Sequence, residues 1–83
     1  MWDQENITID DDGVESEFYC EIKHFDLPSE YGINGGRISK LYVCKIVNGI
    51  RFDPVIHYDR EWNLEPKSEV GKKLLQILID KYN

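Results

Sequence analysis

The sequence predicts an α+β domain in which a four-stranded antiparallel β-meander carries one C-terminal helix packed on one face. Three observations indicate this. Residues 17–24 alternate between polar and apolar side chains, as in a strand that is buried on one face. Asn48-Gly49, a dipeptide favoured in two-residue β-turns, separates two runs rich in strand-forming residues. In residues 70–82, apolar side chains recur at helical spacing.

The first 26 residues are expected to form a hairpin. Ile7 and Ile9 alternate with polar residues, and Asp12-Gly13 is a turn signal. The next strand carries one apolar face, formed by Phe18, Cys20, Ile22 and His24. Residues 26–36 follow as the longest irregular stretch, because they contain Pro28 and three glycines.

Residues 37–58 are expected to form the second hairpin, around Asn48-Gly49. The run 38–47 has apolar side chains on both faces, which is typical of a central strand covered on both sides or of a strand with a bulge. Pro54 has no N–H for a β-ladder, so the last strand lies at an edge or is interrupted there.

After a connector over residues 59–65, the C-terminal helix is predicted over residues 66–82. Pro66 suits a first helical turn, and Ser68 is the alternative N-cap. The expected buried stripe comprises Val70, Leu74, Leu75, Ile77, Leu78 and Tyr82. With 83 residues, the chain is expected to be a single domain over 1–83.

The acidic charge is concentrated in one third of the chain. The formal net charge is −6, but residues 1–26 hold nine acids and one base, whereas residues 27–83 hold seven acids and nine bases. This balance disfavours direct binding to nucleic acid or to anionic membranes, which requires a basic surface. The acidic hairpin is either a solvated face or a patch that docks on a basic protein surface. The candidate residues of that patch are Asp10, Asp11, Asp12, Glu15 and Glu17.

Other features bear on compartment and chemistry. No apolar run approaches the roughly 18–20 residues of a membrane span. Two cysteines without a secretion signal predict a reducing, cytoplasmic compartment and no disulfide framework. Cys20, His24, Cys44 and His57 lack the close spacing of zinc ligands, so we expect no metal and no cofactor. Nothing marks an activated nucleophile, and we expect no enzymatic activity.

The glycine-rich run 31–40 is the first distinctive motif, and three interpretations of it stay open. It forms a turn that leads into a strand, a protein contact, or an anion site built from backbone N–H groups and nearby polar side chains. It lacks the Gly-Lys-Ser/Thr order of a P-loop. The candidate anion-binding residues are Gly35, Gly36, Arg37, Ser39 and Lys40.

The run 58–62 is the second distinctive motif. Asp59 and Arg60 are expected to hold a polar network against the glycine-rich run, while Trp62 covers the join between sheet and helix. Arg and Trp are also enriched at binding hot spots. The candidate protein-contact residues outside the acidic hairpin are therefore Arg37, Lys40, Arg60 and Trp62.

Together these motifs resemble a family of small phage and prophage proteins of Gram-positive bacteria. The resemblance covers residues 31–83 and rests on Tyr-Gly-Ile-Asn-Gly-Gly-Arg-Ile-Ser-Lys-Leu at 31–41 and Tyr-Asp-Arg-Glu-Trp at 58–62. Glu61 stands where the family run has Gly; if that Gly takes a positive φ, Glu61 strains the turn or the turn differs. The resemblance implies a phage origin and carries over no catalytic residue.

The function expected from these features is inhibition of a host defence component, such as a CRISPR effector, in the host cytoplasm. The acidic hairpin would meet a basic surface of the partner, one that normally holds nucleic acid. The alternative is a small-ligand module, or signal sponge, that binds a nucleotide or another anion at the glycine-rich run. Such a shallow site would be completed by a homodimer.

Overall fold

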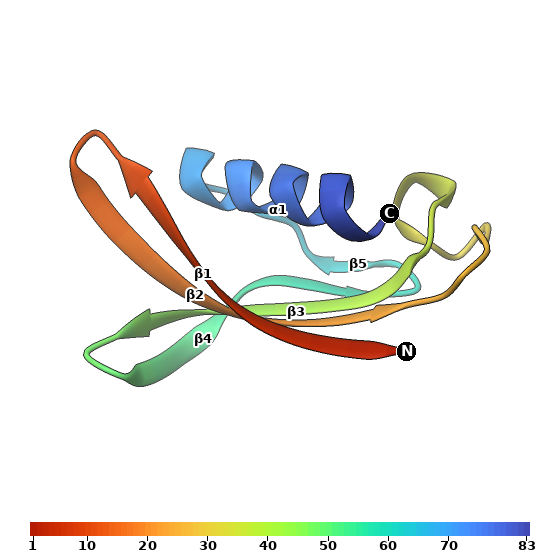
Figure 1. Ribbon diagram of the computed structural model, residues 1–83, viewed down its shortest axis with the longest axis horizontal. Helices are drawn as coiled ribbons and strands as arrows, with labels where there is room; N and C mark the ends of the chain where they lie inside the picture. The colour runs from red at the N-terminus through yellow and green to blue at the C-terminus, as the bar shows by residue number, and fades with distance from the viewer.

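The computed structural model describes residues 1–83 and consists of one antiparallel sheet with a helix across one face (Figure 1). Its elements are β1 (Trp2–Asp11), β2 (Val14–His24), the 3₁₀ turn η1 (Ile33–Gly35), β3 (Ile38–Val47), β4 (Ile50–Asp59), β5 (Trp62–Leu64) and α1 (Glu69–Tyr82). The strands lie in chain order. The predicted α+β class, antiparallel sheet and C-terminal helix are confirmed. The predicted strand number is wrong, because the sheet has five strands rather than four.

The fifth strand lies in the segment that the sequence indicated to be a connector. It has three residues and pairs with β4 through His57 opposite Leu64 and Tyr58 opposite Trp62. Three residues are too few to show an alternating pattern, so no sequence signal marks this strand. Its position turns the Trp62 ring onto Tyr58, with the ring centroids 5.0 Å apart and edge to face.

Both predicted hairpin turns are confirmed. Asp12 and Gly13 have φ values of 54° and 82°, and Asn48 and Gly49 have 52° and 77°. Two successive positive φ values are the mark of a type I′ turn, whose twist matches that of the flanking strands. The two turns lie at the same end of the sheet and diverge from each other (Figure 1). We call this end, which includes residues 12–17 and 46–52, the hairpin end.

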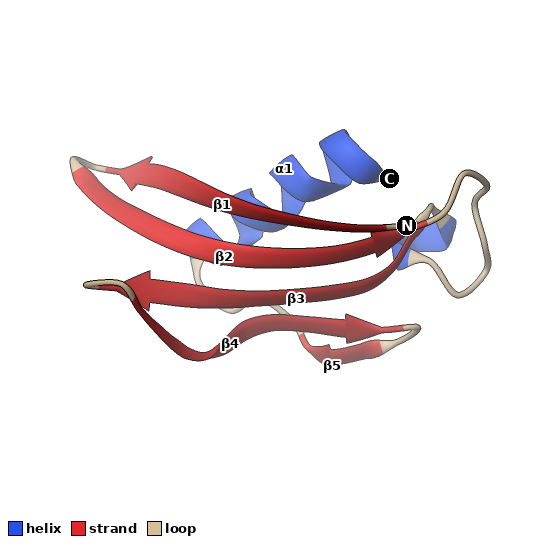
Figure 2. Cartoon of the chain, turned by 60° about the horizontal axis from the view of Figure 1, so that its bottom comes forward, coloured by secondary structure: helices blue, strands red, loops and turns tan.

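The core lies between α1 and the face of the sheet that it covers (Figure 2). Its fully buried side chains include Cys20, Ile22, Leu41, Val43, Ile56, Leu74 and Leu78. The helix begins at Glu69 and not at residue 66, because the Ser68 hydroxyl caps it by accepting a hydrogen bond from the Gly71 amide at 2.9 Å. The prediction that Ile77 belongs to the buried stripe of the helix is wrong, since this side chain is 43% exposed.

The pairing of β3 shifts register at three points, once against β2 and twice against β4. Lys23 lies opposite Lys40 and His24 lies opposite Ile38, so Ser39 is an extra residue in β3. The bulge expected as one interpretation of this strand is therefore present. The register also shifts on both sides of Pro54, but β4 runs unbroken through it, so the strand is not interrupted there. The edge position predicted as the alternative is present instead, because β5 pairs only with His57 and Tyr58 of β4.

No helix covers the opposite face of the sheet, which we call the uncovered face (Figure 2). Strand side chains shield it instead: the Arg51 guanidinium lies 3.6 Å from the centre of the Tyr19 ring, and Cys44 is buried beside them. Because alternate residues of β2 point to this face, it carries Glu15 and Glu17 near the hairpin end and Lys23 at the other end. Glu21 lies on the same face between these two groups, and Arg51 lies near Glu17 across β3.

The glycine-rich run folds into a tight loop at the end opposite the hairpin turns, which we call the loop end. A Cβ atom on Gly32 would lie 2.0 Å from the carbonyl oxygen of Gly36, so only glycine fits there. The Asn83 side-chain amide donates to the Ile33 carbonyl and accepts from the Ile38 amide, both at 3.0 Å. Asn83 thus joins the loop to the C-terminal end of α1.

We predict that Asn83→Ala lowers the free energy of unfolding by about 2 kcal/mol, because two partly buried backbone groups lose their hydrogen-bond partner. The measurement is urea unfolding followed by circular dichroism. Asn63→Ala is the matched control, since the exposed Asn63 side chain makes no hydrogen bond within the chain and its removal should change stability little. Equal effects of the two substitutions would contradict the bridging role of Asn83.

Candidate functional site

The loop end contains a small cavity that brings together both sequence motifs. Its volume is about 180 Å³, and we call it the loop-end pocket. It is lined by Lys23, Phe25, Ser29, Tyr31, Ser39, Lys40 and Arg60. These residues come from the end of β2, the following loop, the start of β3 and the turn between β4 and β5. Three cations, two aromatic rings and three hydroxyl groups therefore meet in one place.

Backbone and side-chain hydrogen bonds join the two motifs around this pocket. The Tyr58 hydroxyl donates to the Tyr31 carbonyl at 2.8 Å, and the Arg60 amide donates to the Ser39 carbonyl at 3.0 Å. The Lys40 ammonium lies 3.7 Å from a carboxylate oxygen of Asp59. The expected polar network between the two runs is thus present.

The pocket holds two arrangements that are unfavourable on their own. Lys23 and Lys40 lie directly opposite each other on neighbouring strands, where like charges repel. Arg60 has a φ of 62°, a conformation that side chains with a Cβ rarely adopt. The strain suspected at Glu61 is therefore located one residue earlier, because Glu61 is not among the residues with positive φ.

The glycine amides expected to bind an anion are already used within the loop. The Gly35 amide donates to the Gly32 carbonyl and the Gly36 amide to the Ile33 carbonyl, both at 2.9 Å. Arg37 is also engaged elsewhere, since its Nε donates to the backbone oxygen of Asn83 at 3.3 Å. Gly35, Gly36 and Arg37 therefore lie outside the loop-end pocket, and the two glycine amides are not free to bind an anion.

The other predicted residues divide between the two faces of the sheet. Ser39, Lys40 and Arg60 line the loop-end pocket. Trp62 packs against the core under the helix, as expected of a residue that covers the join of sheet and helix. Sequence reasoning missed Lys23, Phe25, Ser29 and Tyr31 as pocket residues. One available signal was that Lys23 is the single base in the acidic N-terminal segment.

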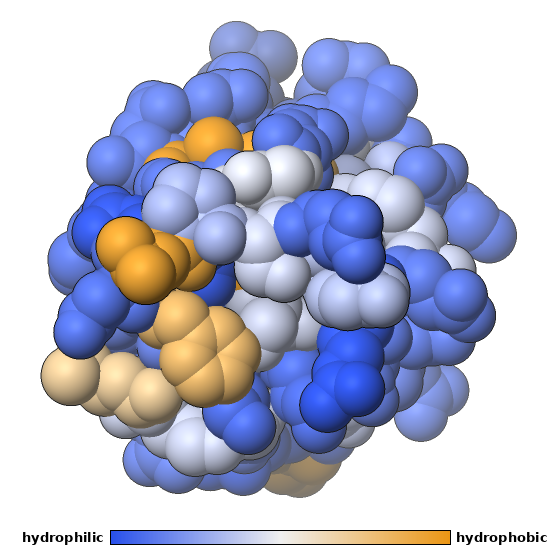
Figure 3. Space-filling view, turned by 90° about the vertical axis from the view of Figure 1, so that its right-hand side faces the viewer, coloured by the Kyte–Doolittle hydropathy of each residue, from blue (hydrophilic) through white to orange (hydrophobic).

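Exposed apolar side chains lie at the same end of the molecule as the pocket. At the loop end, orange and tan side chains gather on one part of the surface (Figure 3). The exposed fractions in this region are 70% for Met1, 54% for Trp2, 47% for Phe25, 76% for Leu27 and 58% for Tyr31. The Lys23 ammonium lies 5.8 Å from the Trp2 ring and 5.5 Å from the Phe25 ring, within the range of a cation–π contact.

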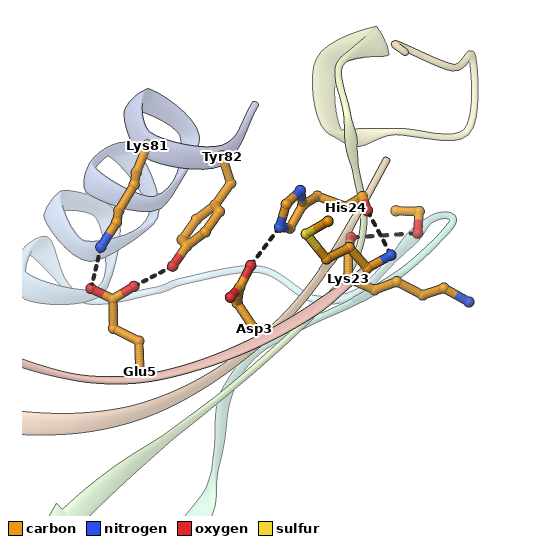
Figure 4. Close-up of polar contacts among 8 residues, drawn as sticks. Asp3, Glu5, Lys23, His24, Lys81 and Tyr82 are labelled. Atoms are coloured by element: carbon orange, nitrogen blue, oxygen red, sulfur yellow. Dashed lines mark hydrogen bonds and ion pairs between the residues drawn. The ribbon is translucent and has the colours of Figure 1, made fainter. Parts of the chain in front are cut away.

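A second group of polar side chains lies on the helix side of β1 (Figure 4). His24 Nε2 is 2.6 Å from an Asp3 carboxylate oxygen, and Glu5 accepts hydrogen bonds from Lys81 and the Tyr82 hydroxyl. These bonds hold the pKa of Glu5 below its usual range. Burial, together with the hydrogen bond to Glu5, raises the pKa of Tyr82. None of the cavities is lined by these residues, and their effect is to attach β1 to the last turn of α1.

The acidic residues of the first hairpin have different surroundings. Asp10 accepts a hydrogen bond from the Gly13 amide, and Asp11 lies 3.7 Å from the Lys73 ammonium. Asp12, Glu15 and Glu17 are exposed and form no ion pair. Glu15 and Glu17 also line a shallow hollow of about 540 Å³ at the hairpin end. This hollow additionally contains Thr8, Ser16, Lys45, Ile46, Val47 and Asn48.

The cysteines and histidines are dispersed. Cys20 faces the core and Cys44 faces the uncovered side, both as free thiols. Burial raises the pKa of Cys20 to about 12, so its thiol stays protonated at neutral pH. His57 packs edge to face on Tyr42. No group of three or more His, Cys, Asp or Glu side chains is arranged to hold a metal ion.

The comparisons with known proteins identify a family for this chain. The model of a family described as "Domain of unknown function (DUF7678)" matches residues 1–83. No curated protein and no solved structure matches the chain. None of its helices is long and apolar enough to cross a membrane.

We predict that Glu5→Gln lowers the free energy of unfolding by about 1 kcal/mol at pH 7, because charge-assisted hydrogen bonds from Lys81 and Tyr82 are weakened. The lowered pKa of Glu5 means that its carboxylate contributes stability above pH 4.5, and that this contribution is lost as the pH falls through the folded-state pKa. Urea titrations at several pH values should therefore show the two proteins converging in acid. A difference that stays constant with pH would contradict the role of the Glu5 charge.

We also predict that Arg60→Gly raises the free energy of unfolding by about 1 kcal/mol, since glycine adopts a positive φ without steric strain. Glu61→Gly is the matched control. It introduces the residue that the resembled family has at this position but relieves no positive φ, so we expect no increase in the free energy of unfolding. Thermal unfolding compares the two variants. Stabilisation by Glu61→Gly alone would show that the strain is not at Arg60.

Proposed function

We propose that this chain, which belongs to the DUF7678 family described as a domain of unknown function, acts by protein–protein contact through the hairpin end. The observation that carries this proposal is the set of exposed acids Asp12, Glu15 and Glu17, which have no cationic partner within the chain. Like charges placed this close repel one another, and a basic partner surface would remove that repulsion.

Exposed apolar side chains at the same end support a protein partner rather than a mobile counterion. The exposed fractions are 65% for Val14, 41% for Val47, 62% for Ile50 and 54% for Phe52. Acidic residues beside apolar ones suit a two-part interface. The charges would accelerate association with a basic surface, and the buried apolar groups would supply most of the affinity.

The proposed partner is a host defence protein with a basic groove that normally holds nucleic acid, such as a CRISPR effector. The resemblance of the runs 31–41 and 58–62 to phage proteins supports this setting. The chain would block the groove by occupying it, without contacting nucleic acid or membrane itself, which fits its net charge of −6. The two free, buried cysteines support a reducing compartment, the host cytoplasm.

The alternative of a nucleotide sponge is less well supported. The loop-end pocket measures about 180 Å³, whereas pockets for small molecules usually measure about 300–1,000 Å³. A homodimer would have to enlarge the pocket before it held a whole nucleotide. The structure therefore favours a contact surface over a sponge.

We predict that the triple variant Asp12→Lys, Glu15→Lys, Glu17→Lys no longer inhibits the defence protein. Its three new lysines would be repelled by the basic surface of that partner. The measurement is the plating efficiency of a phage on cells that carry the targeted defence system and express the chain. Wild-type chain is expected to restore plating, and the variant to restore it at least about tenfold less.

The matched control reverses three exposed acids elsewhere, at Glu30, Glu65 and Asp80. It changes the net charge equally and should retain inhibition, and circular dichroism verifies that both variants fold. Equal inhibition by wild type and the hairpin-end variant would show that the acidic patch is not the working surface. Failure of the wild-type chain against every defence system tested would overturn the proposed function.

A further inference from the structure

We propose that the loop-end pocket binds a single phosphomonoester group, presented on a phosphorylated side chain of another protein. The pocket lies at the end of the molecule opposite the acidic hairpin, so this inference does not rest on the proposed function. Its starting point is the convergence of both sequence motifs on one small cavity.

The charge of the pocket matches that of a phosphomonoester. Lys23, Lys40 and Arg60 bring three positive charges, and the one carboxylate in contact with them is Asp59, beside Lys40. The sum is +2. A phosphomonoester carries about −1.5 to −2 at neutral pH, so its binding would neutralise the pocket. A carboxylate carries half of that charge and would leave one cation uncompensated.

The pocket also supplies suitable hydrogen-bond donors. Neither Lys23 nor Arg60 forms an ion pair within the chain, so their N–H groups are available. The Ser29 oxygen accepts a bond from the Tyr31 amide at 3.1 Å, which leaves the Ser29 hydroxyl hydrogen free to donate. Charge-assisted bonds to phosphate oxygens are among the strongest hydrogen bonds in proteins.

Two unfavourable features of the fold would be offset by the same ligand. The cross-strand pair of Lys23 and Lys40 and the left-handed backbone of Arg60 both lower stability, yet neither serves the core. An anion between the two lysines turns their repulsion into two attractions. The conformation of Arg60 is set by the tight turn into β5, which places this residue at the pocket.

Size and surroundings favour a side chain as the carrier. A cavity of about 180 Å³ has room for a phosphate group and a short stem but not for a nucleoside. The exposed rings of Phe25 and Tyr31 give an apolar rim against which a protein surface can pack. A nucleic-acid carrier is disfavoured by the net charge of −6.

The proposal is tested by NMR titration of the ¹⁵N-labelled chain with inorganic phosphate, O-phosphoserine and AMP. Phosphate and O-phosphoserine are expected to shift the amide signals of Ser39, Lys40 and Arg60. Binding should strengthen between pH 5 and pH 7.5, because the second proton of a phosphomonoester dissociates near pH 6. AMP should bind no more tightly than inorganic phosphate.

Variants identify the site. Lys40→Gln and Arg60→Gly should each weaken phosphate binding by about tenfold, whereas Lys67→Gln, which removes an equal charge from an exposed position, should not. The triple variant Asp12→Lys, Glu15→Lys, Glu17→Lys should still bind phosphate, so this inference and the proposed function can be tested independently of each other. The inference is overturned if neither phosphate nor O-phosphoserine binds, if Lys40→Gln and Arg60→Gly leave binding unchanged, or if AMP binds tenfold more tightly than phosphate.

Discussion

The contact of Leu74 and Leu78 with the covered face of the sheet closes the core, and both side chains are fully buried there. A chain of 83 residues provides a single helix of 14 residues, which covers only one face of the five strands. The other face must therefore shield itself, and the Arg51–Tyr19 stack does so. Polar and charged side chains gather on that uncovered face because no apolar layer excludes them.

Local signals were sufficient for much of this fold. Asp12-Gly13 and Asn48-Gly49 fix two turns by their own backbone preferences, and the helical stripe through Leu74 and Leu78 fixes the covering helix. β5 escaped prediction because its pairing depends on β4 and not on a pattern of its own. The candidate site escaped in part for the same reason, since Lys23 and Lys40 become neighbours only through the pairing of β2 with β3.

The two proposed surfaces lie at opposite ends of one molecule whose longest dimension is 37 Å. The hairpin end carries acids without partners, and the loop end carries cations around a cavity. The net charge of −6 does not show this separation, because the negative charges of one end and the positive charges of the other partly cancel in the sum. A partner that met both ends would need a basic region and an acidic or phosphorylated region in a fixed arrangement.

The inward-facing carboxylates of β1 have a consequence for self-association. β1 is a ten-residue strand at the border of the sheet, and its free backbone groups form a template for β-pairing with another chain. Asp3 and Glu5 occupy its helix side, where His24, Lys81 and Tyr82 hold them. A strand added alongside would bury these charges between layers, at a desolvation cost that opposes aggregation. The same contacts that hold the helix thereby oppose the pairing of another chain along β1.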